Sequence, residues 1–154
     1  MRKLSQYITD QNFQCRCGCG RTQPQGRELI IPEYTDIQHI LFDVYDLIRG
    51  RWNATITSGY RCPLYNQKIG GARYSPHTFG LALDFVVDLK VRNDVIEYLR
   101  ELQKDIRLRI GHKKYFPKPG HIHIDVMPIV AIELYTAQKI PLKVFSAFSG
   151  VKEW

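Results

Sequence analysis

The segment HIHIDV, residues 121–126, constrains the fold of this chain more than any other stretch. Successive side chains of a β-strand point to opposite faces, so His121, His123 and Asp125 share one face and three aliphatic side chains share the other. Three ionisable side chains in a row are costly to bury unless they are paired or bind a metal. The segment therefore predicts a strand that has the core on one face and a polar or metal-binding site on the other.

Length and composition are those of one soluble domain, and we expect a single domain over residues 1–154. Hydrophobic residues make up 44% of the chain and charged residues 24%. The formal net charge of +7 favours an anionic partner such as nucleic acid, a membrane surface or a cell-wall polymer. The Lys and Arg residues form no long run, which argues against a disordered nucleic-acid-binding tail.

Targeting signals are not evident in the sequence. The first residues, MRKLSQYITDQNF, lack the apolar stretch of a secretory signal, and no segment is apolar enough to span a bilayer. We therefore expect the protein to accumulate in the cytoplasm. A substrate outside the cell would be reached only after release.

Hydrophobic periodicity predicts two amphipathic helices, over residues 33–52 and 92–104, and Gly50 is a plausible stop for the first. Strands are predicted at Ala54–Thr57, at Leu81–Asp88 and within residues 107–111 and 121–127. Residues 64–76 are expected to form a loop with at most a helical turn at its start. The cysteine-containing segment 1–32 and the tail 139–154 show no clear period. No βαβ unit repeats, so we expect an α+β fold with helices packed on a small, mainly antiparallel sheet.

A second motif, SPHTFGLALDF, places His77 and Asp84 seven residues apart with a turn expected at Gly80. Each residue alone has an ordinary interpretation, because a strand aspartate more often caps a turn or pairs with a lysine. Arg61 in SGYR alone would be a surface arginine, and Ser75 a turn residue. The order SGYR, S-x-H-x6-D and H-x-H within about 70 residues is hard to obtain by chance and favours one shared site.

The stretch SGYRCPLYNQKIGGARYSPHTFGLALDF, followed by GHIHIDV, resembles the M15 zinc peptidases. These are D-Ala-D-Ala carboxypeptidases and related peptidoglycan peptidases, often phage endolysins, in a wider group with lysostaphin-type enzymes and the hedgehog signalling domain. The resemblance covers residues 13–127 and begins at FQCRCGCG. It implies a hedgehog/DD-peptidase-like fold, one catalytic Zn²⁺ and a peptidoglycan peptide as substrate. We expect a monomer without a nucleic-acid partner.

The same resemblance implies the roles of individual residues. His77, Asp84 and His123 correspond to the zinc ligands, and His121 to the catalytic histidine beside the metal. Two neutral imidazoles and one carboxylate would leave the zinc site a net charge of +1, which keeps the metal a strong Lewis acid.

Two further residues correspond to the substrate-binding positions of the family. Arg61 resembles an arginine that grips the substrate carbonyl or carboxylate, and a guanidinium there would also stabilise a developing oxyanion. Ser75 resembles a serine that helps to position the substrate.

The general base is the point at which the sequence departs from part of the family. Several M15 branches carry Glu or Asp three residues before the last histidine ligand, and here that position is Gly120. His121 is our first choice for the base. Asp125 is second, although orienting an imidazole suits it better, and Glu33 is a third possibility.

The four cysteines, Cys15, Cys17, Cys19 and Cys62, are the right number for a structural zinc. The spacing C-x-C-x-C is tighter than the usual C-x2–4-C, however. A disulfide between Cys62 and one of the other three is the alternative outside the cell, and free thiols are the third.

Three functions remain open at this stage. The first is a zinc peptidase that acts on peptidoglycan. The second is a binding module that keeps the fold and the metal but has lost catalysis, and Gly120 is the feature in its favour. A nucleic-acid binder is the third, and it leaves both histidine motifs unexplained.

Overall fold

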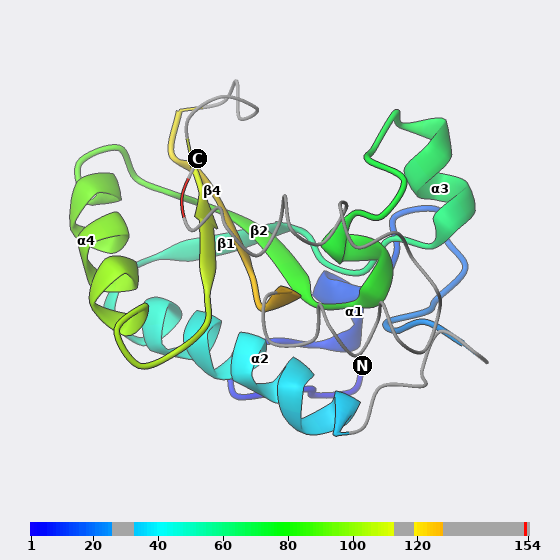
Figure 1. Ribbon diagram of the computed structural model, residues 1–154, viewed down its shortest axis with the longest axis horizontal. Coiled ribbons are helices and arrows are strands. Elements are labelled where there is room, and N and C mark those ends of the chain that lie inside the picture. The colour runs from blue at the N-terminus through cyan, green and yellow to red at the C-terminus, as the bar shows by residue number, and fades with distance from the viewer. Residues whose placement is uncertain (26–32, 113–118, 128–152, 154) are drawn as a thin grey trace.

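A computed structural model describes residues 1–25, 33–112, 119–127 and 153 of the chain (Figure 1). The helices are α1 (Asp10–Phe13), α2 (Tyr34–Arg51), α3 (Pro63–Lys68) and α4 (Arg92–Leu102), with a 3-10 helix, η2, at Pro76–Phe79. The strands are β1 (Ala54–Ser58), β2 (Ala82–Val87), β3 (Arg109–Gly111) and β4 (His121–Asp125).

The four strands form one sheet in the order β1-β2-β4-β3, and every neighbouring pair is antiparallel. This arrangement confirms the prediction of an α+β fold with a small antiparallel sheet. The strands β2 and β4, which carry the two sequence motifs, are direct neighbours in the middle of the sheet. In Figure 1, α2 runs below the strands, and α3 and α4 lie toward opposite ends of the molecule.

One face of the sheet packs against α2. The rings of Tyr45 on α2 and Phe85 on β2 have centroids 5.7 Å apart, and the Tyr45 hydroxyl donates to the carbonyl of Ala54 at 3.1 Å. Because side chains alternate along β2, Asp84 and Val86 point to the opposite face. The apolar half of HIHIDV is likewise in the core, since Ile122, Ile124 and Val126 are all fully buried.

The structure differs from the sequence prediction in residues 64–76. This segment was expected to be a loop with at most a helical turn at its start. The start is the six-residue helix α3, and the end of the segment leads into η2, which was not predicted. Pro63 starts α3 at a position where its fixed φ is favourable, and Ser75 caps η2. Gly50 does not stop α2, which continues to Arg51 and ends where Trp52 turns to an extended backbone.

The short helix α1 was also not predicted. Its first turn is held by a capping box in which the Thr9 hydroxyl accepts from the Asn12 amide at 3.3 Å, and the Asn12 side chain accepts from the Thr9 amide at 2.9 Å. Such a reciprocal pair satisfies amide groups that a four-residue helix leaves free.

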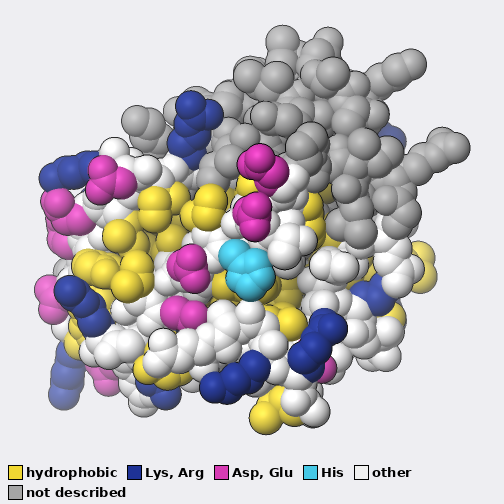
Figure 2. All heavy atoms as spheres, turned by 90° about the horizontal axis from the view of Figure 1, so that it is seen from below, with side chains coloured by type: hydrophobic (Ala, Val, Ile, Leu, Met, Phe, Trp, Pro, Cys, Tyr) yellow, Lys and Arg dark blue, Asp and Glu magenta, His cyan; other side chains and the backbone are white. Residues whose placement is uncertain are grey.

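Figure 2 shows the molecule from the side of α2, where apolar and acidic side chains lie next to one another. A hollow between α2 and the residues after α4 is lined by four apolar residues, Ile40, Val44, Leu47 and Ile106, and by three charged residues, Asp43, Asp105 and Arg107. No helix in the described part of the chain is long and apolar enough to cross a membrane.

Glu153 lies against the outer strand of the sheet and binds two separate elements. Its carboxylate accepts from Nε of Arg100 on α4 at 2.9 Å and from Nε2 of His112 at 2.7 Å, and its backbone forms a parallel bridge with Ile110 on β3. The hydrogen bonds from Arg100 hold the pKa of Glu153 at about 2, although burial opposes the shift. The rest of the tail 139–154, for which no role was predicted, lies outside the described residues.

Glu153→Gln should lower the free energy of unfolding by about 1–3 kcal/mol at pH 7, because it weakens hydrogen bonds between charged groups. The folded-state pKa of Glu153 lies below its ordinary value of 4.5, so the contribution is present above pH 4.5 and is lost as the pH falls toward about 2. Urea denaturation from pH 7 to pH 2 measures this difference.

Glu97→Gln is the matched control, because Glu97 also binds Arg100 but its side chain is 68% exposed. An exposed pair contributes little, so this variant should unfold like the wild type. Equal losses in the two variants would contradict the role of Glu153.

Candidate metal centre

Three buried side chains from three elements converge on the face of the sheet opposite α2. His77 comes from η2, Asp84 from β2 and His123 from β4, where Asp84 and His123 are paired across the two strands. Asp84 Oδ1 lies 3.2 Å from His77 Nε2 and 2.7 Å from His123 Nδ1. One ligand atom from each residue lies within 4.8 Å of the other two, so this group could hold a metal ion.

The hydrogen bonding of His77 identifies its ligand atom. Its Nδ1 lies 2.7 Å from the carbonyl oxygen of Gly59. A carbonyl only accepts, so Nδ1 carries the proton and donates it. In the neutral imidazole, Nε2 then has the free lone pair that a metal requires, and it faces Asp84.

His123 is oriented by a carboxylate rather than by a carbonyl. Its Nε2 donates to Asp125 Oδ2 at 2.7 Å, which leaves Nδ1 directed at Asp84. Asp125 is fully buried and accepts from Nε and Nη2 of Arg109 at 2.9 and 2.8 Å, and from the Met127 amide at 3.1 Å. A histidine ligand whose other nitrogen binds a carboxylate is a common arrangement in metal sites.

The electrostatics of the group depend on this close packing. Burial opposes a charge on His123, but Asp84 and Asp125 outweigh it and raise the pKa of His123 to about 9. Burial also opposes ionisation of Asp84, yet His77 and His123 hold its pKa well below the usual range. For His77, burial is the stronger effect and lowers its pKa despite Asp84. A metal cation bound at this point would compete with a proton on His123.

The backbone around η2 places His77. The Ser75 hydroxyl accepts from the His77 amide at 3.3 Å and so caps this short helix. Gly80 ends it in the left-handed region, with φ of 67°, and its amide donates to the His77 carbonyl at 3.1 Å. Gly80 thus forms the turn between His77 and Asp84 that the sequence suggested.

Arg61 is held beside the group through its backbone and its side chain. Its amide donates to the His77 carbonyl at 3.0 Å, and Nη1 donates to Asn66 Oδ1 at 2.8 Å. Asn66 is buried and donates in turn to the Ala72 carbonyl at 2.7 Å. A Cβ on Gly71 would come within 2.1 Å of Asn66 Oδ1 and 2.9 Å of Arg61 Nη1, so only glycine leaves room for this contact.

One nitrogen of the Arg61 guanidinium, Nε, can still donate a hydrogen bond. This Nε is buried and has no hydrogen-bond partner among the described residues. Burial lowers the pKa of Arg61, and the carboxylate of Asp84 opposes this shift. The side chain is thus a cation that lies close to Asp84 and has an unused donor.

His121 lies two residues before His123 on β4, just outside the three-residue group, and is half buried. It pairs with Val86 while His123 pairs with Asp84, so both histidines lie on the same face of β4. Its Nε2 is 3.0 Å from the hydroxyl of Thr57 on β1.

The backbone at position 120 explains why no acidic residue stands three positions before His123. Gly120 has φ of 81°, and a Cβ there would meet the Val87 carbonyl oxygen at 2.2 Å. The Gly120 carbonyl also accepts from the Val87 amide at 3.0 Å. Any side chain at this position would push β4 away from β2. Glu33 is exposed at the start of α2, and no hydrogen bond joins it to the three-residue group within the described residues.

Several supporting residues were not found from the sequence. They are Thr57, the Gly59 carbonyl, Asn66 and Arg109. Arg109 and Thr57 gave a partial signal, because each lies in a segment that was predicted to be a strand. The partner of Arg109, Asp125, follows from the register of β3 on β4, which pairs these two residues directly.

The fold and the geometry define a protein with a buried His–Asp–His group that could hold a metal, on the polar face of an antiparallel sheet and beside a buried arginine. In a comparison with protein families, residues 6–125 match the family described as Peptidase M15. The chain belongs to this peptidase family, as its motifs predicted. No curated protein and no solved structure gives a significant match.

Gly80→Ala should destabilise the fold by about 2–5 kcal/mol, since it adds strain at positive φ to a collision. A Cβ at this position would lie 2.4 Å from the Tyr34 hydroxyl and 3.1 Å from Gln38 Nε2. Both side chains contact this turn from α2, where Gln38 donates to the Gly80 carbonyl at 3.0 Å. Urea denaturation followed by circular dichroism gives the loss.

Gly70→Ala is the control, because Gly70 also has positive φ, at 73°, but nothing lies within 4 Å of its Cβ position. It should cost only the backbone strain, about 1–2 kcal/mol. If the two variants lose the same stability, the close approach of α2 to the Gly80 turn is not significant.

Proposed function

We propose that the protein is a zinc peptidase that hydrolyses an amide bond in the peptide part of peptidoglycan. One observation carries the proposal: His77 Nε2, Asp84 Oδ1 and His123 Nδ1 point at one another while the other histidine nitrogens are held by Gly59 and Asp125. Membership of the M15 peptidases, which are zinc enzymes, supports it independently.

The donor set suits zinc in a catalytic rather than a structural site. Ligand distances of about 2.0–2.2 Å place the atoms of one tetrahedral set about 3.3–3.6 Å apart. The observed separation of 3.2 Å is close to this range and that of 2.7 Å is shorter, so His123 and Asp84 would have to move apart to admit the ion. Three protein ligands leave a fourth position for water or substrate, and bound zinc would supply a Lewis acid that polarises a carbonyl and lowers the pKa of a water.

Arg61 is the residue that we propose to bind the substrate. Its unused Nε and the positive charge suit a carbonyl oxygen or a terminal carboxylate of the peptide. The Asn66 contact fixes the guanidinium before substrate arrives, so little conformational entropy is lost on binding. Ser75 is mainly engaged in holding His77, and any contact with substrate would be a second role for its hydroxyl.

His121 is the residue that we propose to move the proton. It shares the face of His123, is partly accessible, and has the Thr57 hydroxyl to orient its ring. Asp125 suits this role less, because it is fully buried and already accepts from Arg109, His123 and Met127. We therefore assign Asp125 to orienting His123.

The net charge of +7 supports a cell-wall substrate, because the wall is anionic and a basic protein is drawn to it. Carboxypeptidase and endopeptidase activities, including those of phage lysins, share these motifs. Mass spectrometry of the fragments released from defined muropeptides distinguishes them. Release of the protein from the cytoplasm to the wall stays a prediction.

The alternative is a wall-binding module of the same fold without catalysis. Its main support in the sequence was the glycine at position 120. The collision with Val87 gives that glycine a backbone reason that has no bearing on catalysis. Binding to walls with no released fragments would nevertheless favour the module.

Removal of the metal should abolish activity. Treatment with a chelator should stop the purified protein from lowering the turbidity of susceptible cell walls, and added Zn²⁺ should restore it. His123→Ala should lose both the zinc of this site and all measurable activity, because it removes a ligand. Hydrolysis that survives chelation and the loss of this zinc would refute the proposed mechanism.

His121→Ala should instead keep that zinc and lower kcat by about 10²–10⁴-fold, the usual contribution of a general acid or base. Metal analysis and muropeptide kinetics test both parts. His39→Ala is the control, because His39 is an exposed histidine on α2. A fully active His121→Ala enzyme would mean that another residue takes the proton.

A further inference from the structure

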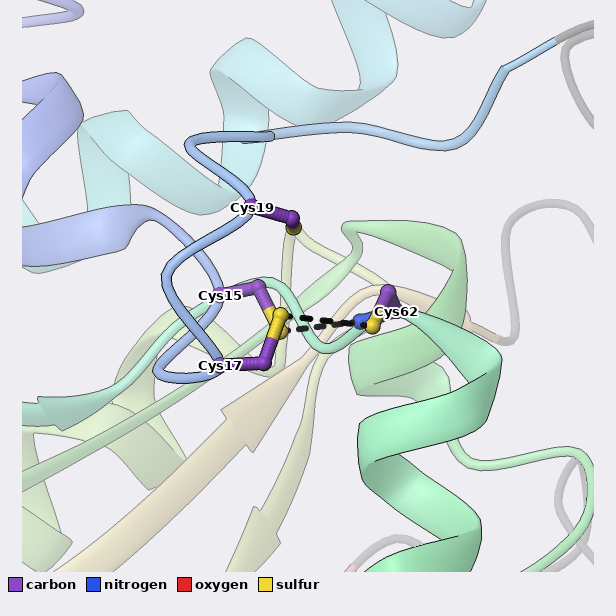
Figure 3. Close-up of side chains that lie close together, drawn as sticks. All are labelled: Cys15, Cys17, Cys19 and Cys62. Carbon is purple, nitrogen blue, oxygen red and sulfur yellow. Dashed lines mark hydrogen bonds between the residues drawn. The ribbon is translucent and has the colours of Figure 1, made fainter.

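The four cysteines form a second cluster, outside the His–Asp–His group. Cys15, Cys17 and Cys19 come from the N-terminal segment and Cys62 from the residue before α3, yet their sulfurs all lie within 4.8 Å of one another. Figure 3 shows the side chains of Cys15 and Cys17 directed together and facing Cys62. Packing alone accounts for the buried Cys15 and Cys62, but not for the exposed Cys17 and Cys19 at the same point.

The backbone explains how the tight spacing C-x-C-x-C brings three thiols together. Gly18 and Gly20 both have positive φ, at 89° and 72°. Gly18 lets the chain turn between Cys17 and Cys19, and Gly20 lets it turn again after Cys19. The amide of Cys15 donates to the Arg21 carbonyl at 2.9 Å and closes the loop. The spacing that seemed too short for a metal site is thus compensated by left-handed glycines.

We infer that Cys15, Cys17, Cys19 and Cys62 bind one structural Zn²⁺ as four thiolates. Four sulfur ligands in a closed set are typical of structural zinc and leave no open position. The amide of Cys62 donates to Cys15 Sγ at 3.3 Å, and the positive charge of Arg21 lies near Cys19. Both contacts would offset part of the negative charge that four thiolates leave around a divalent ion.

This site would position the loop 59–62, which serves the His–Asp–His group. The Tyr60 amide donates to the Phe13 carbonyl at 2.8 Å, and a Cβ on Gly59 would lie 2.4 Å from the same oxygen, so the cysteine segment packs directly on the loop. In this loop the Gly59 carbonyl holds His77, and Arg61 follows Gly59 by two residues. Zinc on the cysteines would therefore fix both.

The decisive experiment is metal analysis of the full chain, expressed with Zn²⁺ and purified with a reductant that does not bind metal. We expect two zinc ions per wild-type chain. Cys17→Ser and Cys19→Ser should each retain one, and so should His123→Ala. Arg16→Ser, an exposed change between two of the cysteines, is the matched control and should retain both.

The variants also separate this inference from the proposed function. Replacement of zinc by Co²⁺ should give sulfur-to-metal charge-transfer absorption, which is lost in Cys17→Ser but kept in His123→Ala. If the wild-type chain holds one zinc ion and Cys17→Ser holds the same one, the cysteine site is wrong and the catalytic site stands. If the wild-type chain holds two zinc ions and His123→Ala still holds both, the catalytic site is wrong and the cysteine site stands.

Thiol chemistry gives an independent readout. A thiol reagent should react slowly with the native zinc-loaded chain, although Cys17 and Cys19 are exposed, and should titrate four thiols after denaturation with a chelator. Cys17→Ser should also lower the thermal midpoint by about 5 °C or more, because zinc bound to the native state stabilises it. Rapid reaction of the exposed thiols in the native chain, or a Cys17–Cys62 disulfide in protein purified without an oxidant, would refute the site.

Discussion

The pairing of Asp84 with His123 across β2 and β4 is the contact on which the rest of the site depends. It lies inside the sheet, so these two charged side chains are buried together and must satisfy one another or share a cation. Asp125 and Arg109 extend the same network to β3 through a buried ion pair. A metal site built on these central strands would have little freedom to deform, which would suit catalysis.

The remaining parts of the site are attached to this network through backbone groups rather than through side chains alone. A carbonyl of the loop 59–62 sets the tautomer of His77, and an amide of the same loop donates to the His77 carbonyl. Glycines recur at points of close approach, at positions 59, 71, 80 and 120, because a Cβ at each would collide with a neighbouring backbone or side-chain atom. Their role is to allow close approach, and at Gly120 this requirement removes the acidic residue that part of the family uses.

The two clusters of metal-binding residue types then have complementary roles. The His–Asp–His group offers three ligands and an open position, whereas the cysteines offer a closed set of four. The loop between them carries Arg61, so a structural ion on one side would stabilise the residue that we propose to bind substrate on the other. A rigid support beside a reactive site would be one use for two metal sites in a small domain.

Much of this protein was evident from local sequence. Alternation in HIHIDV gave the strand and its two faces, the 3.6-residue period gave α2 and α4, and the order of the motifs indicated the family, because each of these signals lies within a few neighbouring residues. The short helix α3 was expected only as a helical turn and η2 was missed, since proline and serine caps there outweigh a turn-rich composition. The strand register, the Arg109–Asp125 pair, the Asn66–Arg61 contact and the convergence of Cys62 on the N-terminal thiols were decided only by the tertiary structure. Each joins residues far apart in the chain, and no local pattern specifies which distant backbone will come within hydrogen-bonding distance.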